Sequence, residues 1–252
     1  MEQIQIDTLA SGYKIIQDKE RFMYGIDAVL LSAFAFCGLK KKKQKIADLG
    51  TGNGIIPLLL ASAFKTQEEK ISAEITGIEI QKASAQLAQK SVLMNRLQNQ
   101  ISIINGDLKR IDSFMPKHCM QVVISNPPYM LPEHGLKNSA DAKTIARHEV
   151  LCSLEDVISA ADYLLLPRGS FFMIHRPFRL PEIFAALKAH KMEPKKMQLI
   201  YPFEDKEPNL VLLEARKNAQ PELKILPNLI VREKDGQYTE KINEMYALFG
   251  QK

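Results

Sequence analysis

The sequence predicts an α/β fold built on a doubly wound, mostly parallel sheet of about seven strands. From residue 45 onward, short apolar runs alternate with longer helical segments, and repeated strand–helix units of this length build a parallel sheet. The main candidates for functional side chains are Asp48, Glu79, Asp107 and Asn126, which all stand at or just after the end of an expected strand. The carboxyl ends of parallel strands meet at one edge, where such sheets bind their ligands.

Composition narrows the class of protein. The chain has 252 residues, of which 25% are charged and 46% hydrophobic, as in an ordinary soluble globule, and its net charge of +5 favours an anionic partner. Three cysteines without paired spacing indicate neither a disulfide framework nor a zinc site, so we expect no metal and a reducing cytoplasm. We find no signal-peptide pattern and no apolar run long enough to span a bilayer, so no membrane partner is expected.

Residues 1–44 are expected to form an N-terminal extension. Short extended pieces are predicted at Ile4–Ile6 and Tyr13–Gln17, because Ser11 and Gly12 separate two apolar stretches. The apolar segment Ala28–Phe36 predicts a helix, and Asp27 just before it is well placed to be its N-cap.

Residues 45–218 are expected to form the main domain, in which strands and helices alternate. The expected strands are Lys45–Leu49, Ile75–Ile80, Ile101–Asn105, Gln121–Ser125 and Ser170–His175, with two more near Gln198–Tyr201 and Leu210–Ala215. The expected helices are Gly54–Phe64, Lys82–Leu97, Leu154–Leu165 and Leu180–His190. Residues 219–252 form a C-terminal extension with an apolar piece, Leu223–Val231, and a helix, Thr239–Phe249. This extension is either an edge strand with a closing helix or a docking element.

The stretch Ser125–Tyr129 ends a buried apolar strand with two adjacent prolines. Neither Pro127 nor Pro128 carries a backbone N–H for the ladder, so the chain leaves the sheet as a stiff turn. The side-chain oxygen of Asn126 and the carbonyl of Pro127 can then accept both N–H bonds of one planar amine. The Tyr129 ring can stack on an attached base. From these residues alone, a merely rigid loop stays open as the alternative.

Such an arrangement suits the chemistry of a conjugated amine. The lone pair of an amine attached to a ring is delocalised, which makes the amine a poor nucleophile. Two acceptors that hold both hydrogens out of the ring plane concentrate the lone pair toward an electrophile. We therefore predict that Asn126, Pro127, Pro128 and Tyr129 are the catalytic residues, without a strong general base.

A glycine loop joins the first strand of the main domain to its helix. It reads Asp48-Leu49-Gly50-Thr51-Gly52-Asn53-Gly54, and its glycines allow close backbone approach to a ligand. A dinucleotide fingerprint would place its third glycine at Ile55, and its acidic residue about 20 residues on. Glu79 lies 25 residues beyond Gly54, so a dinucleotide is disfavoured.

A nucleoside without phosphates fits these residues better. Glu79 can accept both hydroxyls of a ribose, because an ionised carboxylate is an acceptor only. Asp107 can accept from the amino group of an adenine, with Ile80 and Leu108 flanking the ring. Each carboxylate alone is more simply a loop charge or a helix cap; it is their succession at strand ends that favours a ligand site.

These motifs together resemble the S-adenosylmethionine-dependent methyltransferases of the amino-methylating type. Within them, the chain is similar to the bacterial tRNA adenine-N6 methyltransferase family that modifies tRNA(Val) beside its anticodon. The closer likeness rests on Gln17, on Phe22–Leu31, on Ala146–Glu149 and on Asn209–Ala215. It covers about residues 10–217.

The resemblance implies a Rossmann-like class I methyltransferase fold, S-adenosyl-L-methionine as cofactor and S-adenosyl-L-homocysteine as product. It implies tRNA as partner, and N6 of the adenosine at position 37, on the 3′ side of the anticodon, as target. Gly50–Gly54 would hold the methionine portion, and the segment Tyr24–Asp27 would close over the cofactor. The cofactor-binding residues implied are Gln17, Tyr24, Gly25, Asp27, Asp48, Gly50, Thr51, Gly52, Asn53, Gly54, Glu79, Ile80, Asp107, Leu108 and Asn126.

The polar segment Met130–Glu149 follows the catalytic motif and is the expected substrate flap. Its residues Lys137, Lys143, Arg147 and His148 are available to phosphates, with solvated loop charges as the alternative. Other planar amines remain open as targets, namely adenine in rRNA or DNA and the glutamine side chain of a protein. Only about 44 residues precede the first strand of the main domain, which leaves no expected room for a separate recognition domain. A non-catalytic RNA-binding module on the same fold is a further alternative, and no pattern specifies the oligomeric state.

Overall fold

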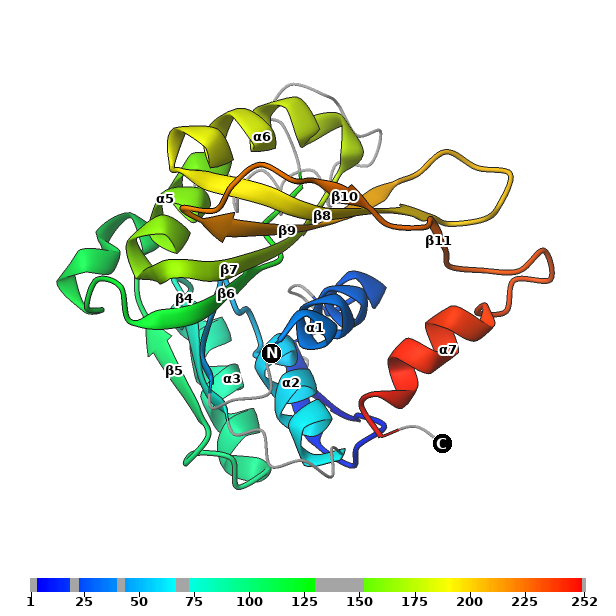
Figure 1. The fold of residues 1–252 in the computed structure, drawn as a ribbon. Helices are drawn as coiled ribbons and strands as arrows, with labels where there is room; N and C mark the ends of the chain where they lie inside the picture. The colour runs from blue at the N-terminus through cyan, green and yellow to red at the C-terminus, as the bar shows by residue number, and fades with distance from the viewer. Residues whose placement is uncertain (1–3, 19–22, 40–43, 67–72, 130–151, 251–252) are drawn as a thin grey trace, which may run out of the picture.

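A computed structural model describes residues 4–18, 23–39, 44–66, 73–129 and 152–250. Its centre is a nine-stranded sheet with the strand order β10-β8-β9-β7-β6-β3-β4-β5, and β11 pairs with β8 beside β10 (Figure 1). The strands are β3 Gln44–Leu49, β4 Ala73–Glu79, β5 Ile101–Asn105, β6 Met120–Ser125, β7 Leu165–His175, β8 Met192–Tyr201, β9 Leu210–Lys217, β10 Lys224–Ile225 and β11 Leu229–Ile230.

The sheet is mostly parallel, as predicted. Strands β3 to β7 pair in parallel, whereas β9 runs antiparallel to both β7 and β8. Strand β3 lies between β4 and β6, so the strand order reverses there and the carboxyl ends of β3 and β6 are neighbours. The register pairs Leu49 with Ser125. This is the switch point at which open α/β sheets bind ligands.

Helices cover both faces of the sheet (Figure 1). Helices α1 (Ile26–Gly38), α2 (Ile55–Thr66) and α3 (Lys82–Met94) lie on one face, and α5 (Leu154–Leu164) and α6 (Leu180–Ala189) lie on the other. Successive strand residues point to opposite faces: Ile46 and Phe172 belong to the core under the first helices, while Ala47 and Phe171 belong to the core under α5 and α6. Burial on both faces explains the almost continuous apolar runs of the strands.

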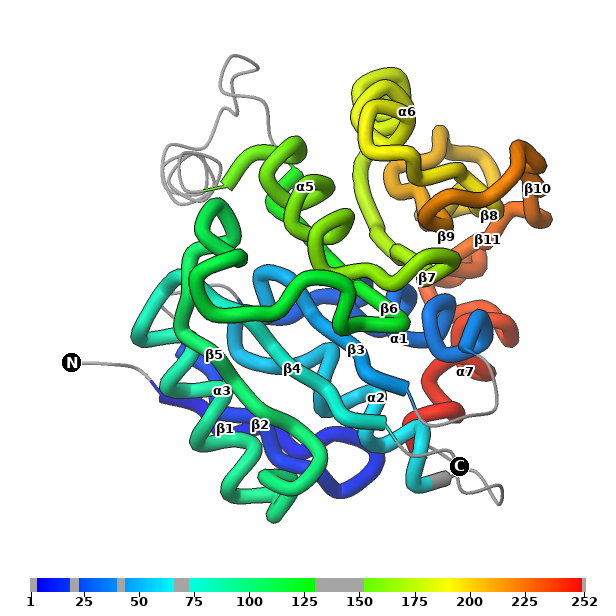
Figure 2. Tube along the Cα trace, turned by 60° about the vertical axis from the view of Figure 1, so that its left-hand side comes forward, coloured from blue at the N-terminus to red at the C-terminus, as the bar shows by residue number. Residues whose placement is uncertain are grey.

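The N-terminal hairpin packs on α3 (Figure 2). Its strands, β1 (Ile4–Thr8) and β2 (Lys14–Asp18), pair antiparallel. The backbone N–H of Ile16 donates to the Ser91 hydroxyl at 2.9 Å, and that of Lys14 donates to Asn95 Oδ1 at 2.8 Å. The hairpin is therefore anchored to the body through α3.

The C-terminal residues add to both the sheet and the core. Strands β10 and β11 pair in parallel with β8, and α7 (Glu240–Ala247) contacts α1. The hydroxyl of Ser62 in α2 donates to the carbonyl of Phe249 at 3.0 Å, and Phe249 is buried. The tail thus supplies edge strands and a helix that closes over the first core.

One local prediction is wrong: Asp27 is not the N-cap of the first helix. Helix α1 begins at Ile26, with Gly25 as its N-cap, so Asp27 lies inside the first turn. Its carboxylate instead accepts hydrogen bonds from Asn126 and Tyr129, which follow the end of β6. An acidic side chain in the first turn is still favourable, because it faces the positive end of the helix dipole.

Other differences concern the ends of elements. Helix α3 stops at Met94, three residues before the expected end, because Arg96 has φ of 57° and the Leu97 N–H turns back to the Val92 carbonyl. Strand β7 starts at Leu165, directly after α5. Within the described ranges, no helix combines the length and the apolar character that crossing a bilayer requires.

Candidate active site

The glycine loop between β3 and α2 is open on the side away from the protein. Gly50, Gly52 and Gly54 have φ of 73°, 57° and 85°, in the left-handed region that favours glycine. A Cβ at Gly50 or Gly52 would meet no atom within 4 Å, whereas a Cβ at Gly54 would lie 3.1 Å from the Cβ of Ala88. Gly54 thus serves the packing of α2 against α3, whereas the backbone at the first two glycines has open space beside it.

Asp48 is fully buried beneath this loop. Neither of its carboxylate oxygens has a hydrogen-bond partner among the residues that the structure describes. Burial above all raises the pKa of Asp48, the neighbouring Thr51 hydroxyl lowers it and the charge of Glu79 raises it, and together these effects bring the pKa to about 7. An unpartnered buried acceptor is costly, so this position suits a ligand that brings a donor.

Glu79 ends β4 and ties it to the glycine loop. Its Oε2 accepts from the backbone N–H of Gly52 at 2.9 Å, and its Oε1 accepts from that of Gln81 at 2.8 Å. Asn105, at the end of the neighbouring strand β5, donates through Nδ2 to the carbonyls of Glu79 (2.7 Å) and Ile80 (3.0 Å). The carboxylate is therefore held in place from two sides, with lone pairs left for further donors.

Asp107 follows β5 and caps the 3₁₀ helix η1 (Leu108–Ser113). Its Oδ1 accepts from the backbone N–H of Lys109 at 3.0 Å, so the capping role considered for this residue is present. Leu108 is buried directly after it, and Ile80 is half-buried at the end of β4. The cap engages only Oδ1, so Oδ2 can still accept a hydrogen bond from a ligand.

Gln17 connects the N-terminal hairpin to the glycine loop. Its buried Oε1 accepts from the Tyr24 backbone N–H at 3.1 Å and from Asn53 Nδ2 at 3.0 Å, and its Nε2 donates to Asp7 Oδ2 at 2.5 Å. Gln17 thus fixes the segment before α1 against the loop. Burial raises the pKa of Tyr24, and the charge of Asp7 raises it further.

The predicted catalytic motif, Asn126–Tyr129, leaves the sheet beside this loop, as its position in the sequence predicts. Ser125 donates through its hydroxyl to the Leu49 carbonyl at 2.9 Å, which binds the end of β6 to the end of β3. Asn126 Nδ2 donates to Asp27 Oδ2 at 3.0 Å. The Tyr129 hydroxyl donates to the same Asp27 oxygen at 2.8 Å and also contacts Asn126 Oδ1. Asn126, Tyr129 and Asp27 therefore form one hydrogen-bonded cluster.

The Tyr129 ring is held by two residues at the end of β7. The ring of His175 meets it edge-on, with centroids 5.4 Å apart, and the Arg176 guanidinium lies 5.1 Å from the Tyr129 centroid. Burial and the Asp27 carboxylate raise the pKa of Tyr129 well above its usual value, so the phenol keeps its proton. Sequence reasoning did not single out His175, although it occupies the strand-end position that identified Asn126.

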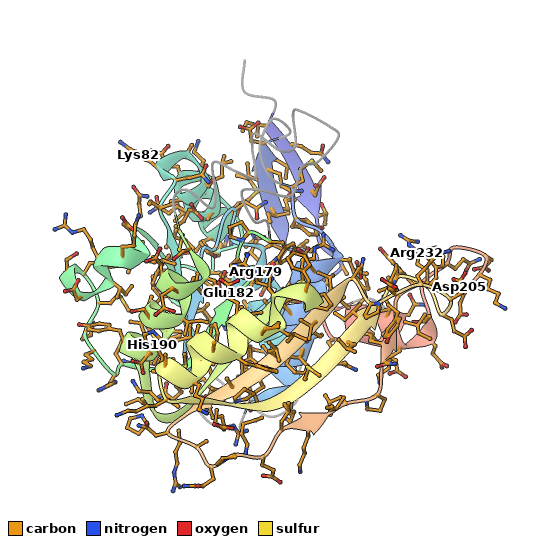
Figure 3. All side chains as sticks on the ribbon, turned by 90° about the horizontal axis from the view of Figure 1, so that it is seen from above. Lys82, Arg179, Glu182, His190, Asp205 and Arg232 are labelled. Atoms are coloured by element: carbon orange, nitrogen blue, oxygen red, sulfur yellow. The ribbon has the colours of Figure 1, made fainter. Side chains whose placement is uncertain are left out.

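His175 itself is buried and neutral. Burial above all, together with the nearby Arg179 guanidinium, lowers its pKa to about 4, although the Glu182 carboxylate acts in the opposite direction. Its Nδ1 accepts from the Arg176 backbone N–H at 2.8 Å. The following turn, η2 (Pro177–Arg179), is held by two hydrogen bonds from Arg179 to Glu182, at 2.6 and 2.7 Å (Figure 3). The residues beside Tyr129 thus stand on a braced turn.

Some predicted residues lie outside the described part of the chain. These are Lys137, Lys143, Arg147 and His148, the candidates for phosphate contacts. Over the described ranges, no cluster of three or more His, Cys, Asp or Glu side chains is placed to hold a metal ion.

The described residues fit an adenosine-type cofactor with a cationic, amino-acid-like end. The open backbone at Gly50 and Gly52, the unpartnered Asp48 carboxylate and the anchored Glu79 carboxylate offer space and acceptors along one strand edge. The motif predicted to hold an amine begins one residue beyond Ser125, which pairs with Leu49 next to that loop. A donor nucleoside and an acceptor amine can therefore meet at the ends of β3 and β6.

Comparison with solved structures identifies the fold as that of class I S-adenosylmethionine-dependent methyltransferases. A protein of Agrobacterium tumefaciens described as a predicted O-methyltransferase superposes with a TM-score of 0.69 at 23% identity, covering 90% of this chain and 98% of that chain. A 16S rRNA N2 G1207 methyltransferase of T. thermophilus, solved with AdoMet and guanosine, superposes with a TM-score of 0.56 at 18% identity, covering 85% of this chain and 50% of that one.

Residues 27–179 match the model of the methyltransferase small domain, and the chain belongs to this family. Curated relatives extend the similarity beyond these residues. The tRNA1(Val) (adenine(37)-N6)-methyltransferase of Porphyromonas gingivalis is 29% identical over 195 residues, which are 76% of this chain and 73% of that protein. The enzyme of the same name from Proteus mirabilis is 28% identical over 238 residues, 93% of this chain and 90% of its own length.

Proposed function

We propose that the protein transfers the methyl group of S-adenosyl-L-methionine to the exocyclic N6 of adenosine 37 in tRNA1(Val), in the cytoplasm. The observation that carries this proposal is the placement of Asn126–Tyr129 at the end of β6, beside the glycine loop at the end of β3. The names of the curated relatives support the choice of target, since they specify this tRNA and this position.

The cofactor, when bound, supplies an electrophilic methyl group on a sulfonium centre. In this proposal Gly50 and Gly52 admit its methionine portion, and Asp48 receives the ammonium group of that portion. Glu79 accepts from the ribose hydroxyls, because its position is fixed by Gly52 and Gln81 while each oxygen keeps a lone pair. Asp107 accepts from the adenine amine, and Ile80 and Leu108 flank the ring.

The residues around the target amine act by orienting it. Asn126 Oδ1 and the Pro127 carbonyl accept the two hydrogens of the target N6, and Pro128 keeps the turn stiff. With both hydrogens held by Asn126 Oδ1 and the Pro127 carbonyl, the nitrogen lone pair would be directed at the methyl group that the bound cofactor supplies. The cofactor would leave as the neutral thioether S-adenosyl-L-homocysteine, and the proton that the nitrogen loses would pass to solvent. His175 is neutral with a low pKa and is buried behind the Tyr129 ring, so we assign it no proton transfer.

A base inside a folded anticodon loop must be turned out of its stack to reach Asn126. Arg176 and Phe178 stand on the turn next to Tyr129, and Phe178 is 62% exposed, an unusual state for a large aromatic side chain. We propose that this turn receives the neighbouring nucleotides by charge and by stacking. Lys137, Lys143, Arg147 and His148 are proposed to contact phosphates.

The proposal is tested with labelled S-adenosylmethionine and an unmodified tRNA1(Val) transcript. We expect one N6-methyladenosine per transcript and none when adenosine 37 is replaced by guanosine. rRNA fragments, duplex DNA with adenine targets and glutamine peptides serve as competing substrates. Methyl transfer to one of these substrates instead of tRNA would show that our proposal names the wrong target amine. Cofactor binding without transfer to any substrate would show that the protein is a non-catalytic module.

The variant Asn126→Ala tests the proposed mechanism. It should keep cofactor affinity within about twofold while methyl transfer falls by about 100-fold or more, which is the usual loss when one oriented polar group is removed from a reacting centre. Asn99→Ala is the matched control, because Asn99 is exposed and precedes the amino end of β5, whereas the proposed site lies at the carboxyl ends of the parallel strands. Equal transfer rates in both variants would remove Asn126 from the mechanism.

A further inference from the structure

Asp27 makes contacts that a cofactor-closing residue does not need. It lies in the first turn of α1, 99 residues before Asn126, yet its Oδ2 accepts from Asn126 Nδ2 at 3.0 Å and from the Tyr129 hydroxyl at 2.8 Å. Its Oδ1 accepts from the Ala28 backbone N–H at 3.0 Å. The carboxylate thus joins the N-terminal segment directly to the catalytic motif.

The first consequence concerns the amide of Asn126. A carboxylate only accepts hydrogen bonds, so the group that Asn126 turns toward Asp27 must be its NH2. The amide oxygen is then directed away from Asp27, where it can accept a hydrogen from the target amine. Without the carboxylate, the amide can rotate by half a turn and present NH2 to another NH2, a pairing of donors that opposes binding.

The second consequence concerns the hydroxyl of Tyr129. This hydroxyl has one proton and lies against two acceptors, Asp27 Oδ2 and Asn126 Oδ1. An incoming amine needs the Asn126 oxygen for itself. With its proton on the Asp27 side, the phenol stays satisfied while Asn126 Oδ1 turns to the amine.

The backbone beside Asp27 is adapted to the position of its carboxylate. Gly25 has φ of −109°, which any residue adopts, so it is not there for conformational freedom. A Cβ at Gly25 would lie only 2.8 Å from Asp27 Oδ1. A larger residue at this position would therefore push the carboxylate away from Ala28 and out of the cluster.

We propose that Asp27 is a positioning residue for methyl transfer: it fixes the amide of Asn126 with its oxygen toward the target amine and gives Tyr129 a partner other than that oxygen. The inference deepens the proposed function, because the amine it serves is the N6 of the adenosine. It assigns Asp27 to the group of residues that hold the target amine, in contrast to the cofactor-binding role expected from the sequence.

Exchanging the carboxylate and the amide between positions 27 and 126 tests the pairing of Asp27 with Asn126. Asp27→Asn should lower kcat by about 10- to 100-fold, the range expected for one hydrogen bond to a charged group, with the dissociation constant of S-adenosylmethionine within about twofold. Asn126→Asp should lower kcat further, because it sets two carboxylates against each other. The double variant Asp27→Asn/Asn126→Asp should be more active than Asn126→Asp alone, since a donor again faces a carboxylate. Asp112→Asn, an exposed position on η1, is the control.

A spectroscopic measurement keeps the inference testable apart from the proposed substrate. The side-chain NH2 resonances of Asn126, assigned with Asn126→Ala in 15N-labelled protein, should shift and exchange faster with solvent in Asp27→Asn and in Gly25→Ala. The inference is overturned if these resonances stay unchanged, if the double variant shows no recovery, or if cofactor affinity falls as much as kcat. If the wild-type protein methylates no RNA but the Asn126 resonances shift as expected in the two variants, the proposed function is refuted and the contact of Asp27 with Asn126 is still supported.

Discussion

Gly50, in the loop after β3, can be a glycine for two reasons: the turn needs a left-handed backbone conformation, or the cofactor needs the space that a side chain would fill. The variant Gly50→Ala separates these two reasons. Gly50 has φ of 73°, and an added Cβ would meet no protein atom within 4 Å. The cost to the fold is then only the left-handed conformation, about 1–2 kcal/mol, partly offset by about 0.4–1 kcal/mol from the less flexible unfolded chain. A net cost near 1 kcal/mol lowers the melting temperature of a protein of this size by about 2–4 °C.

Gly236 provides a matched control. Its φ is 86°, a Cβ there would likewise meet nothing within 4 Å, and its N–H donates to a backbone carbonyl at 2.9 Å, as that of Gly50 does. Gly236→Ala should therefore cost the same stability. The two variants should differ in cofactor affinity, because only at Gly50 does the new methyl group occupy the space proposed for the methionine portion.

Isothermal titration with S-adenosylmethionine and thermal unfolding measure both quantities on the same samples. We expect Gly50→Ala to bind the cofactor at least about tenfold more weakly, equivalent to about 1.4 kcal/mol, and Gly236→Ala to bind it like the wild type. If Gly50→Ala loses stability but keeps its cofactor affinity, the glycine serves the turn alone and our placement of the cofactor is refuted.

Three further predictions address other parts of the site. Glu79→Gln should weaken S-adenosylmethionine binding without changing tRNA affinity, because it removes the charge proposed to face the ribose; unaltered cofactor affinity in a titration would refute that role. His175 has a pKa of about 4 in the folded protein and an ordinary value of 6.5 when unfolded, so the unfolded chain binds the extra proton first. The free energy of unfolding should thus fall by about 3 kcal/mol between pH 6.5 and pH 4 through this residue, and denaturant titrations of His175→Asn should lack that part of the decline. Phe178→Ala should raise the KM for tRNA about fivefold or more by loss of stacking, whereas Leu93→Ala, at an equally exposed position of α3, should not; equal KM values would exclude a stacking role.

The fold and the strand-end residues were predictable because they depend on local pattern. The apolar runs fixed β3 to β6 to within about two residues, and the prolines after Ser125 marked where the chain leaves the sheet. An edge strand within Leu223–Val231 was one of two alternatives, but its division into β10 and β11 was not predictable, because two residues each are too few to produce a recognisable alternation. They exist because β8 offers an edge to pair with, which is a tertiary effect.

The connections between site residues were less predictable. Asp27 carried the local signal of a helix cap, and only the folded chain brings its carboxylate to Asn126 and Tyr129. His175 and Arg176 contact Tyr129 because β7 pairs with β6, a relation that depends on strand order. Asn105 precedes Asp107 by two residues and had no separate signal, although it anchors the turn after Glu79.

In our proposal, a sulfonium methyl group and the N6 of an adenine meet at the ends of β3 and β6. A crystal structure with S-adenosylhomocysteine and an anticodon stem-loop of tRNA1(Val) would show whether they do. We predict that N6 of adenosine 37 lies within hydrogen-bond distance, about 3 Å, of Asn126 Oδ1 and of the Pro127 carbonyl, with the cofactor sulfur facing it. A cofactor sulfur remote from Asn126, or an adenine amine held by other residues, would refute the proposed reaction geometry.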